Sequence, residues 1–369
     1  MAVYKIFPES DTFIFSETPT GNAGKDEILE IGGYADISGT GRTKRTLFKF
    51  NTSEIQDVVN NKIGSNSWSA SIRGYLAQAN ELPVAHTLYA YPVSTTWDNG
   101  VGKFGDLPVN KSGVSWTYRR AEQESSWATS GYGAGITGSY IAGQEGGGTW
   151  YTGSAGVNLE ASQSFALNAD LDLNIDVTNA TELFYSESLS NNGFIVKLPD
   201  NLEFNVSRSI QLRYFGVDTN TIYPPSLEFK WDDSSYLTGS LSVLSNSECQ
   251  INIKNNRGEY VDEGKQRFRI FAKPTYPTRT FTTSSVYLTN YALPTNSYWA
   301  LRDENTEEMV VDFDTSYTKI SCDSTGPYFD VYMDGLQPER YYRLLIKTTL
   351  DGSTTVVDNK NIFKIVRNG

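Results

Sequence analysis

The sequence contains 369 residues, which is long for a single hydrophobic core, so two or three domains are expected. With 43 acidic residues against 31 Lys and Arg, the net charge of -12 would repel a phosphate backbone, and no apolar run is long enough to cross a membrane. The charge therefore excludes nucleic acid as the expected partner. The lack of a long apolar run excludes a chain that itself crosses a membrane. An aromatic content of 13% favours a folded chain over a disordered one.

The N-terminal residues contain no basic segment followed by an apolar stretch, so we expect no signal peptide and a chain made in the cytoplasm. In that compartment Cys249 and Cys322 are expected to be free thiols, although a disulfide between them remains open.

Apolar and polar residues alternate from end to end between turn residues, which is typical of β-strands. The clearest such strands are at residues 28–31, 46–50, 87–93, 210–215, 249–253, 268–271, 329–333 and 341–347. Two segments indicate helices: one is capped by Thr52 or Ser53 and continues to Ile63, and one is capped by Thr178 or Asn179 and continues to about Ser190. The fold class is therefore all-β.

Residues 113–156 contain many glycines with interspersed Trp and Tyr side chains, and we expect a long ordered loop there. Two interpretations remain open. The aromatics either pack the loop onto a sandwich or form a contact surface for a glycan or another subunit. With the preceding tryptophan included, the candidate contact residues are Trp97, Trp116, Trp127, Tyr132, Tyr140, Trp150 and Tyr151.

A polar turn after Trp231 predicts a domain boundary, which gives residues 1–232 and 233–369, and a further division near residue 277 remains open. In the second part, strands are also expected at residues 241–244, 309–313 and 354–357, and Asp351-Gly352 predicts a tight hairpin turn.

An ordered series of motifs in residues 3–232 resembles the DNRLRE-type jelly-roll domain. The motifs occur at residues 11–14 (DTFI), 22–24 (NAG), 29–32 (LEIG), 45–50 (RTLFKF), 69–76 (SASIRGYL), 89–93 (YAYPV), 96–98 (TWD), 113–116 (GVSW), 176–178 (DVT), 192–197 (NGFIVK) and 225–229 (PSLEF). The resemblance implies an antiparallel sandwich of carbohydrate-binding-module type. In such a sandwich we expect Leu47 and Phe48 to face the core, with Arg45 and Arg73 at the rim.

Residues 335–344 (GLQPERYYRL) resemble the turn before the penultimate strand of fibronectin type III and related immunoglobulin-like domains. The resemblance implies a C-terminal part of one or two immunoglobulin-like β-sandwiches, with Tyr341 or Tyr342 bonding the corner to nearby backbone. A jelly roll followed by such sandwiches is similar in overall build to accessory structural proteins of tailed bacteriophages, which need no export signal.

Catalytic and metal-binding patterns are weak. The one histidine, His86, begins a strand, where packing is expected rather than catalysis, and neither cysteine has a histidine nearby in sequence. Asp170, Asp172 and Asp176 alternate with apolar residues and are expected on the wet face of a strand. They would also suit a structural calcium ion, but no specific motif supports one, so no cofactor is expected.

These observations lead to a non-enzymatic virion component as the expected function. It would lie in a neck, tail, fibre or capsid decoration, bind other virion proteins and form a homo-oligomeric ring or trimer. The alternative is an adhesive module whose exposed Trp and Tyr faces stack on host surface polysaccharide. A polysaccharide-degrading enzyme that uses paired carboxylates is a third hypothesis.

Overall fold

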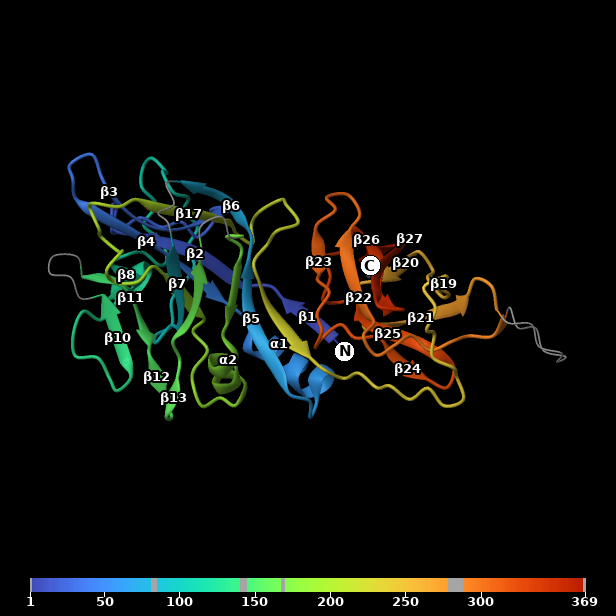
Figure 1. Cartoon of the computed structure of the whole chain (residues 1–369). Coiled ribbons are helices and arrows are strands. Elements are labelled where there is room, and N and C mark those ends of the chain that lie inside the picture. Colours follow the sequence, from blue (N-terminus) through green and yellow to red (C-terminus); the bar gives the residue numbers. More distant parts are fainter. Residues whose placement is uncertain (1, 81–84, 140–144, 167–169, 278–287, 368–369) are drawn as a thin grey trace. The chain divides into compact units, whose positions relative to one another are not determined.

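The computed structural model describes residues 2–80, 85–139, 145–166, 170–277 and 288–367 (Figure 1). Its sheets are almost entirely antiparallel, which confirms the all-β prediction. The chain divides into two compact units. The N-terminal unit contains Ile6–Lys62 and Ser69–Glu228, and the C-terminal unit contains Met1–Lys5, Ile63–Trp68 and Phe229–Gly369.

The largest sheet has eight strands in the order β14-β7-β16-β4-β3-β17-β6, with β2 also paired to β4. Their bounds are β2 (Ser10–Phe15), β3 (Ile28–Ala35), β4 (Gly41–Lys49), β6 (Leu76–Asn80), β7 (His86–Pro92), β14 (Ala161–Phe165), β16 (Phe194–Lys197) and β17 (Ile210–Phe215). Strand β17 alternates buried and half-buried residues, as period-two patterning requires, whereas β16 is buried throughout. The centre of the sheet is therefore covered on both faces.

The two faces of this central region have different coverings. Phe194 packs against Phe184 of helix α2 (Thr178–Tyr185), with 5.3 Å between the ring centroids. The neighbouring residue Ile195 belongs to a second core cluster, which also contains Leu47 and four tryptophans, namely Trp97, Trp116, Trp127 and Trp150. Successive strand residues thus serve separate cores on opposite faces of the sheet.

A four-stranded sheet has the order β1-β18-β5-β15, with β1 (Ala2–Ile6), β5 (Trp68–Gly74), β15 (Leu173–Asp176) and β18 (Ser226–Trp231). Strands β5 and β15 pair antiparallel, and Ile72 lies opposite Ile175. Asp176 alternates with buried Ile175, as the wet-face prediction requires, although β15 begins only at Leu173. Residues 167–169, just before this run, lie outside the described residues.

Both predicted helices are present, but their ends differ from the predictions. Helix α1 (Thr52–Asp57) continues as the π-helix η1 (Val58–Ile63), and its cap is Asn51, whose side chain accepts a hydrogen bond from the Ser53 N–H. Helix α2 ends at Tyr185, before the predicted Ser190. Its first turn is capped from outside the helix, because Asp176 accepts the Thr178 N–H at 2.9 Å.

The described part of residues 113–156 is a set of short hairpins rather than one long loop. The elements are β8 (Tyr118–Arg120), the 3₁₀ turn η2 (Ala121–Gln123), β9 (Ser125–Ser126), β10 (Ile136–Ser139), β11 (Gly146–Tyr151) and β12 (Gly153–Ser154), which pairs with β13 (Val157–Asn158). Strand β10 pairs with β11, and β8 pairs with β9. We call residues 113–156 the aromatic arm.

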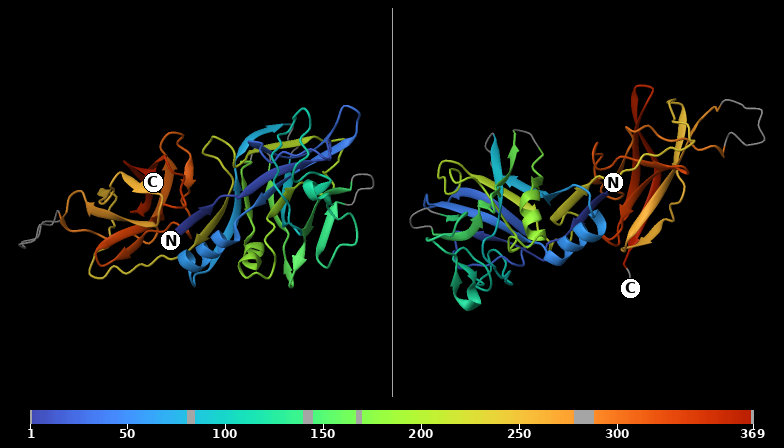
Figure 2. Two further views of the ribbon diagram at one scale, coloured as in Figure 1. Left: turned by 180° about the vertical axis from the view of Figure 1, so that it is seen from behind. Right: turned by 90° about the horizontal axis from the view of Figure 1, so that it is seen from below.

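The C-terminal unit contains two facing sheets, whose strands form separate layers in Figure 2. One sheet has the order β19 (Cys249–Ile253), β21 (Lys265–Pro274), β25 (Gly326–Tyr332), β24 (Ser321–Asp323). The other has the order β20 (Glu259–Val261), β27 (Ser353–Val366), β26 (Tyr341–Leu350), β22 (Tyr298–Asp303), β23 (Met309–Val311). The rings of Trp299 and Phe329 stack between the two sheets, with 5.2 Å between their centroids, and belong to one continuous core cluster.

Local features of this unit test several sequence predictions. The Tyr342 hydroxyl donates to the Gln337 carbonyl at 2.9 Å, which confirms the predicted corner. Asp351 and Gly352 have positive φ angles and form the predicted turn between β26 and β27. Residues 241–244, in contrast, form no strand, because Val243 makes only a single bridge with Ala292. The division considered near residue 277 adjoins residues 278–287, which lie outside the described residues.

Both cysteines are free thiols, as expected. Within the described residues, every helix is too short or too polar to span a lipid bilayer.

Candidate functional site

The four tryptophans proposed as contact residues are buried. Their exposed fractions are 3% for Trp97, 2% for Trp116 and Trp127, and 4% for Trp150. Their faces are therefore closed to a sugar ring, which corrects the expectation of exposed stacking platforms and favours the packing interpretation. The rings help to hold the aromatic arm against the large sheet.

Hydrogen bonds of the indole N–H groups help to explain the burial of two of these rings, Trp97 and Trp127. The Trp97 Nε1 donates to the Asn192 carbonyl at 2.9 Å, and the Trp127 Nε1 donates to the Ser115 carbonyl at 3.0 Å. A buried indole with its N–H satisfied avoids the desolvation penalty of an unpaired donor.

Three tyrosines complete the predicted set. Tyr132 and Tyr151 are half-buried on the aromatic arm, and burial raises the pKa of Tyr132. Tyr140 lies outside the described residues. The four tryptophans therefore share one buried cluster, and of the described contact candidates only Tyr132 and Tyr151 keep part of their surface open.

A buried ion network fixes the arm to β4. The exposed fraction of Arg45 is 0%, which corrects its expected place at the rim. Its guanidinium binds Glu203 through Nε to Oε1 at 2.8 Å and Nη2 to Oε2 at 2.6 Å, and it also donates to the Gly147 carbonyl of the arm. Lys197 Nζ lies 3.3 Å from Glu203 Oε2. A buried carboxylate with two cationic partners is compensated for its lost hydration.

The tryptophans of the arm pack on these cations. The Arg45 guanidinium lies 4.8 Å from the ring centroid of Trp116 and 5.1 Å from that of Trp150. Gly147 has a φ of +73°, and a Cβ added there would lie 2.4 Å from the Trp116 ring. A glycine is needed at this position both for the backbone conformation and for the space that the indole fills.

A second loop, residues 98–114, was not singled out from the sequence. We call it the apolar loop. The side chain of Asn22 anchors this loop through three hydrogen bonds. Its Nδ2 donates to the Asn99 and Val114 carbonyls at 2.8 and 2.7 Å, and its Oδ1 accepts from the Gly102 N–H at 2.8 Å. Because Asn22 is 2% exposed, these bonds are shielded from water and give the loop a fixed shape.

The apolar loop exposes four large apolar side chains, which we call its crest: Val101, Phe104, Leu107 and Val109. Leu107 is 92% exposed and Val101 is 65% exposed, while Phe104 and Val109 are 37% and 39% exposed. Beneath the crest lies a cavity of about 240 Å³, lined by Phe15, Phe104, Leu107, Val109 and polar residues such as Asn22 and Asp106. The surface therefore combines projecting apolar side chains with a pocket at their base.

Phe104 is held in place from the sheet side. Its ring lies 5.1 Å from that of Phe15 in an edge-to-face arrangement, and Lys44 Nζ lies 4.0 Å from its centroid. Lys44 is itself anchored by Glu30 at 2.6 Å. The pocket wall is thus preorganised by packing and charge.

The sequence does contain a signal for this loop. Four large apolar residues occur at positions 101, 104, 107 and 109, among glycines, a proline and polar residues, where neither helix nor strand periodicity would place them in a core. Large apolar side chains in a turn-rich segment with no core-facing period are candidates for a surface contact.

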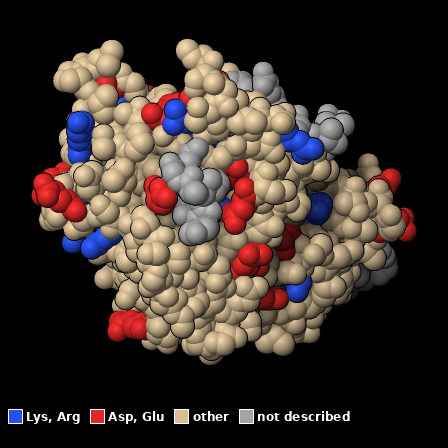
Figure 3. Space-filling view, turned by 90° about the vertical axis from the view of Figure 1, so that its left-hand side faces the viewer, with Lys and Arg blue, Asp and Glu red and all other residues tan. Residues whose placement is uncertain are grey.

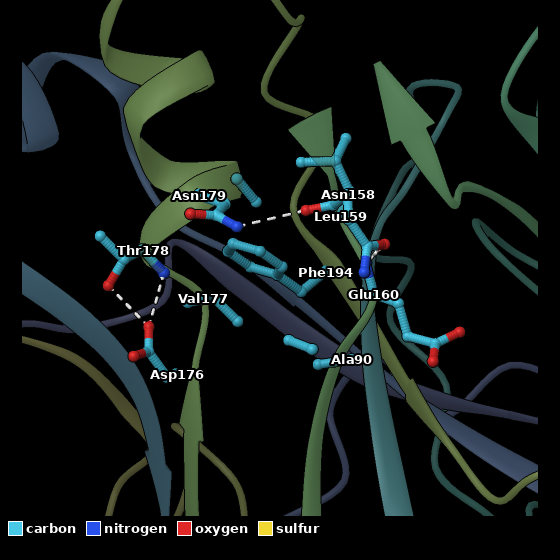
Figure 4. A pocket seen from close by; sticks show the side chains of 11 residues that line it. Ala90, Asn158, Leu159, Glu160, Asp176, Val177, Thr178, Asn179 and Phe194 are labelled. Atoms are coloured by element: carbon cyan, nitrogen blue, oxygen red, sulfur yellow. Dashed lines mark hydrogen bonds between the residues drawn. The ribbon is translucent and has the colours of Figure 1, made fainter. Parts of the chain in front are cut away.

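A smaller cavity of about 150 Å³ opens beside the N-terminus of α2 (Figure 4). Ala90 and Phe194 contribute apolar surface, and Asn179 Nδ2 donates to the Asn158 carbonyl at 3.3 Å. The polar groups at its edge already have protein partners: Asp176 accepts from Thr178, and Glu160 accepts the Tyr91 hydroxyl at 2.9 Å. This cavity is therefore a secondary feature.

The remaining chemical candidates occupy structural positions. His86 is 6% exposed and stacks on Phe165 at 5.0 Å, and burial lowers its pKa. Asp172 accepts the Leu76 N–H at 2.8 Å. Across the described part of the chain, no three His, Cys, Asp or Glu side chains converge in a way that would hold a metal ion.

The charged side chains visible on one face of the molecule are dispersed. Figure 3 shows several acidic residues near the centre of the face and basic residues scattered among uncharged ones, and no basic cluster gathers in the described part of this face. Such a surface offers no electrostatic track for a polyanion.

No family model matches the sequence. No curated protein matches it either. Among solved structures, a DUF4785 family protein from Legionella pneumophila matches at 8% identity and a TM-score of 0.17. That match covers 98% of this chain and 66% of the other. No inference about fold or function is drawn from a match with this TM-score.

Proposed function

We propose that this chain is a non-catalytic structural component of a tailed-bacteriophage virion and that it binds another virion protein through the apolar loop. Support for the virion setting comes from the sequence resemblance, namely a jelly-roll-like part followed by an immunoglobulin-like part. The proposal includes four places in the particle, namely the neck, the tail, a fibre and a capsid decoration.

The observation that carries the proposal is the exposed crest of the apolar loop. A soluble chain rarely exposes a cluster of large apolar side chains unless a partner covers it. Protein interfaces concentrate their binding energy in a few anchors that fill pockets and exclude water. The crest at Leu107 and the 240 Å³ cavity at its base supply both a projecting anchor and a receptor for one.

Protein contact is favoured over glycan contact for a structural reason. Glycan stacking needs a flat aromatic face open to solvent, and Trp97, Trp116, Trp127 and Trp150 are all buried. Three of the four large exposed apolar side chains, those of Val101, Leu107 and Val109, are aliphatic, which suits another protein surface better than a polar sugar.

The test is incorporation of the chain into particles. The full chain, Leu107→Asp and Ile37→Asp would each be expressed with the other structural genes of the phage, and purified particles would be quantified by mass spectrometry. Ile37 is the matched control, because it is equally apolar and fully exposed but lies outside the apolar loop. We expect Leu107→Asp to reduce incorporation about tenfold or more, because a charge would be buried at an anchor, while Ile37→Asp behaves like the unmodified chain.

Two outcomes would count against parts of the proposal. A chain absent from all particles would overturn the virion assignment. Incorporation of Leu107→Asp at the unmodified level would overturn the role of the apolar loop. Circular dichroism of each purified variant would establish that the fold is retained.

A further inference from the structure

The outer edge of β27 at residues 353–357 is unusually open. On its inner side β27 pairs with β26, from Ser353 opposite Leu350 to Val357 opposite Ile346. On its outer side β20 pairs only with Lys364, Ile365 and Val366. In the described ranges, no strand pairs with the outer edge of residues 353–357.

The other edges of the two facing sheets are short or covered. Strands β20, β23 and β24 contain three residues each. At β19 the Ile251 carbonyl accepts a hydrogen bond from Asn359 Nδ2 at 2.6 Å. Short or covered edges are the usual protection against pairing with another chain.

Residues 353–357 lack such protection. Their sequence is Ser-Thr-Thr-Val-Val, with no charge and no proline, and four of the five are exposed. The first charged residue is Asp358, where the strand also begins to bulge, as the positive φ of Lys360 and the shifted register with β26 indicate. The open edge is therefore a regular, uncharged segment that ends at a bulge.

The tight turn determines which backbone groups point outward. A two-residue hairpin loop is closed by a hydrogen-bonded pair, here Leu350 and Ser353, and alternate residues along the strand turn their N–H and C=O groups away from the partner. Counting from Ser353, the outward-facing residues are Thr354 and Val356.

We propose that residues 353–357 pair antiparallel with the same residues of a second copy of this chain. A two-fold axis perpendicular to the sheet at Thr355 would place Thr354 of one copy opposite Val356 of the other, twice. Both outward-facing residues are then matched with outward-facing partners, and Thr355 lies opposite itself. The contact is isologous and closes as a dimer, in place of the ring or trimer expected from the sequence.

The charges near this segment favour self-pairing. In this register Asp351 lies opposite Asn359, and Asp358 lies opposite Gly352, so no like charges meet across the axis. The pair at the centre, Thr355 with Thr355, is a favourable cross-strand combination. A second copy can therefore pair with the open edge without placing like charges opposite each other.

The experiment uses charge at the two-fold axis. Sedimentation velocity across a dilution series would be measured for the full chain, Thr355→Lys, Thr355→Glu and the control Thr315→Lys. We expect the unmodified chain to dimerise and each Thr355 variant to dissociate about tenfold or more readily, because like charges then lie directly opposite each other. An equimolar mixture of Thr355→Lys and Thr355→Glu should dimerise again. Thr315→Lys, at an exposed turn residue outside β26 and β27, should leave the dimer unchanged.

A strictly monomeric unmodified chain would overturn this proposal, and so would dimerisation that survives in Thr355→Lys alone. The pairing does not involve the apolar loop, so Leu107→Asp should still dimerise. Failure of one proposal is thereby distinguishable from failure of the other.

Discussion

Asp11 on β2 is a buried carboxyl group whose ionisation should set the pH dependence of the N-terminal unit. It is 2% exposed, and its Oδ2 accepts the Val217 N–H at 2.7 Å. Burial raises the pKa of Asp11 from 3.8 to about 7, and the charge of Asp218 adds to the effect, while the Val217 bond and Lys25 oppose it. Replacing this residue by the neutral isostere, Asp11→Asn, removes the ionisation and keeps an oxygen acceptor for Val217.

The expected magnitude follows from the difference between the folded and unfolded pKa values. Below a pH of about 3.8 both states hold the proton, so the group has no pH-dependent effect. As the pH rises towards 7, the unfolded chain releases the proton while the folded chain retains it, so the free energy of unfolding falls. At roughly 1.36 kcal/mol per pKa unit, the loss reaches about 4 kcal/mol above pH 7.

The assay is urea unfolding of the unmodified chain and of Asp11→Asn at about pH 4 and about pH 8, followed by circular dichroism. Relative to the unmodified chain, Asp11→Asn should gain up to about 4 kcal/mol on going from the lower to the higher pH. Asp36→Asn is the control, because hydrogen bonds from Ser38 and Arg42 hold the pKa of Asp36 below its usual range, so the folded chain keeps this group ionised at both pH values. That variant should change the free energy of unfolding by nearly the same amount at about pH 4 and about pH 8. An Asp11→Asn effect of equal size at both pH values would refute the reasoning.

Two further predictions concern the buried polar networks. Arg45→Ala leaves Glu203 buried with one of its two cationic partners removed, so the free energy of unfolding should fall by about 3 kcal/mol in a urea titration. A result below about 1 kcal/mol would show that Lys197 alone compensates Glu203. Asn22→Ala leaves buried backbone groups unpaired, so it should cost about 2 kcal/mol and speed protease cleavage within residues 98–114. An unchanged cleavage rate would show that other contacts hold the loop.

Strands with clear alternation and turn residues at both ends were predictable from the sequence. The structure reproduces the predicted bounds 210–215 and 249–253 as β17 and β19. Residues 241–244 also alternate, but a strand needs a partner over several residues, and Val243 has a bridge only to Ala292. Helix ends were less predictable, because Asn51, Thr52 and Ser53 are all suitable caps and only one can be used.

The candidate site was less predictable than the fold. Sequence alone does not show whether an aromatic residue near glycines faces solvent or protein. The arm's rings became buried because Arg45, expected at the rim, instead lies under Trp116 and pairs with a carboxylate far along the chain. The exposure of Leu107 depends in turn on the anchoring of its loop by Asn22, which is a contact across about a quarter of the chain.

The Arg45–Glu203 pair also has a consequence for synthesis of the chain on the ribosome. Arg45 emerges 158 residues before its carboxylate partner. At translation rates of about 5–20 residues per second, it waits roughly 8–30 s for that partner. During that interval the sheet centre cannot close over Arg45 without burying an unpaired charge. Any expression fragment that ends before residue 203 would keep that defect permanently.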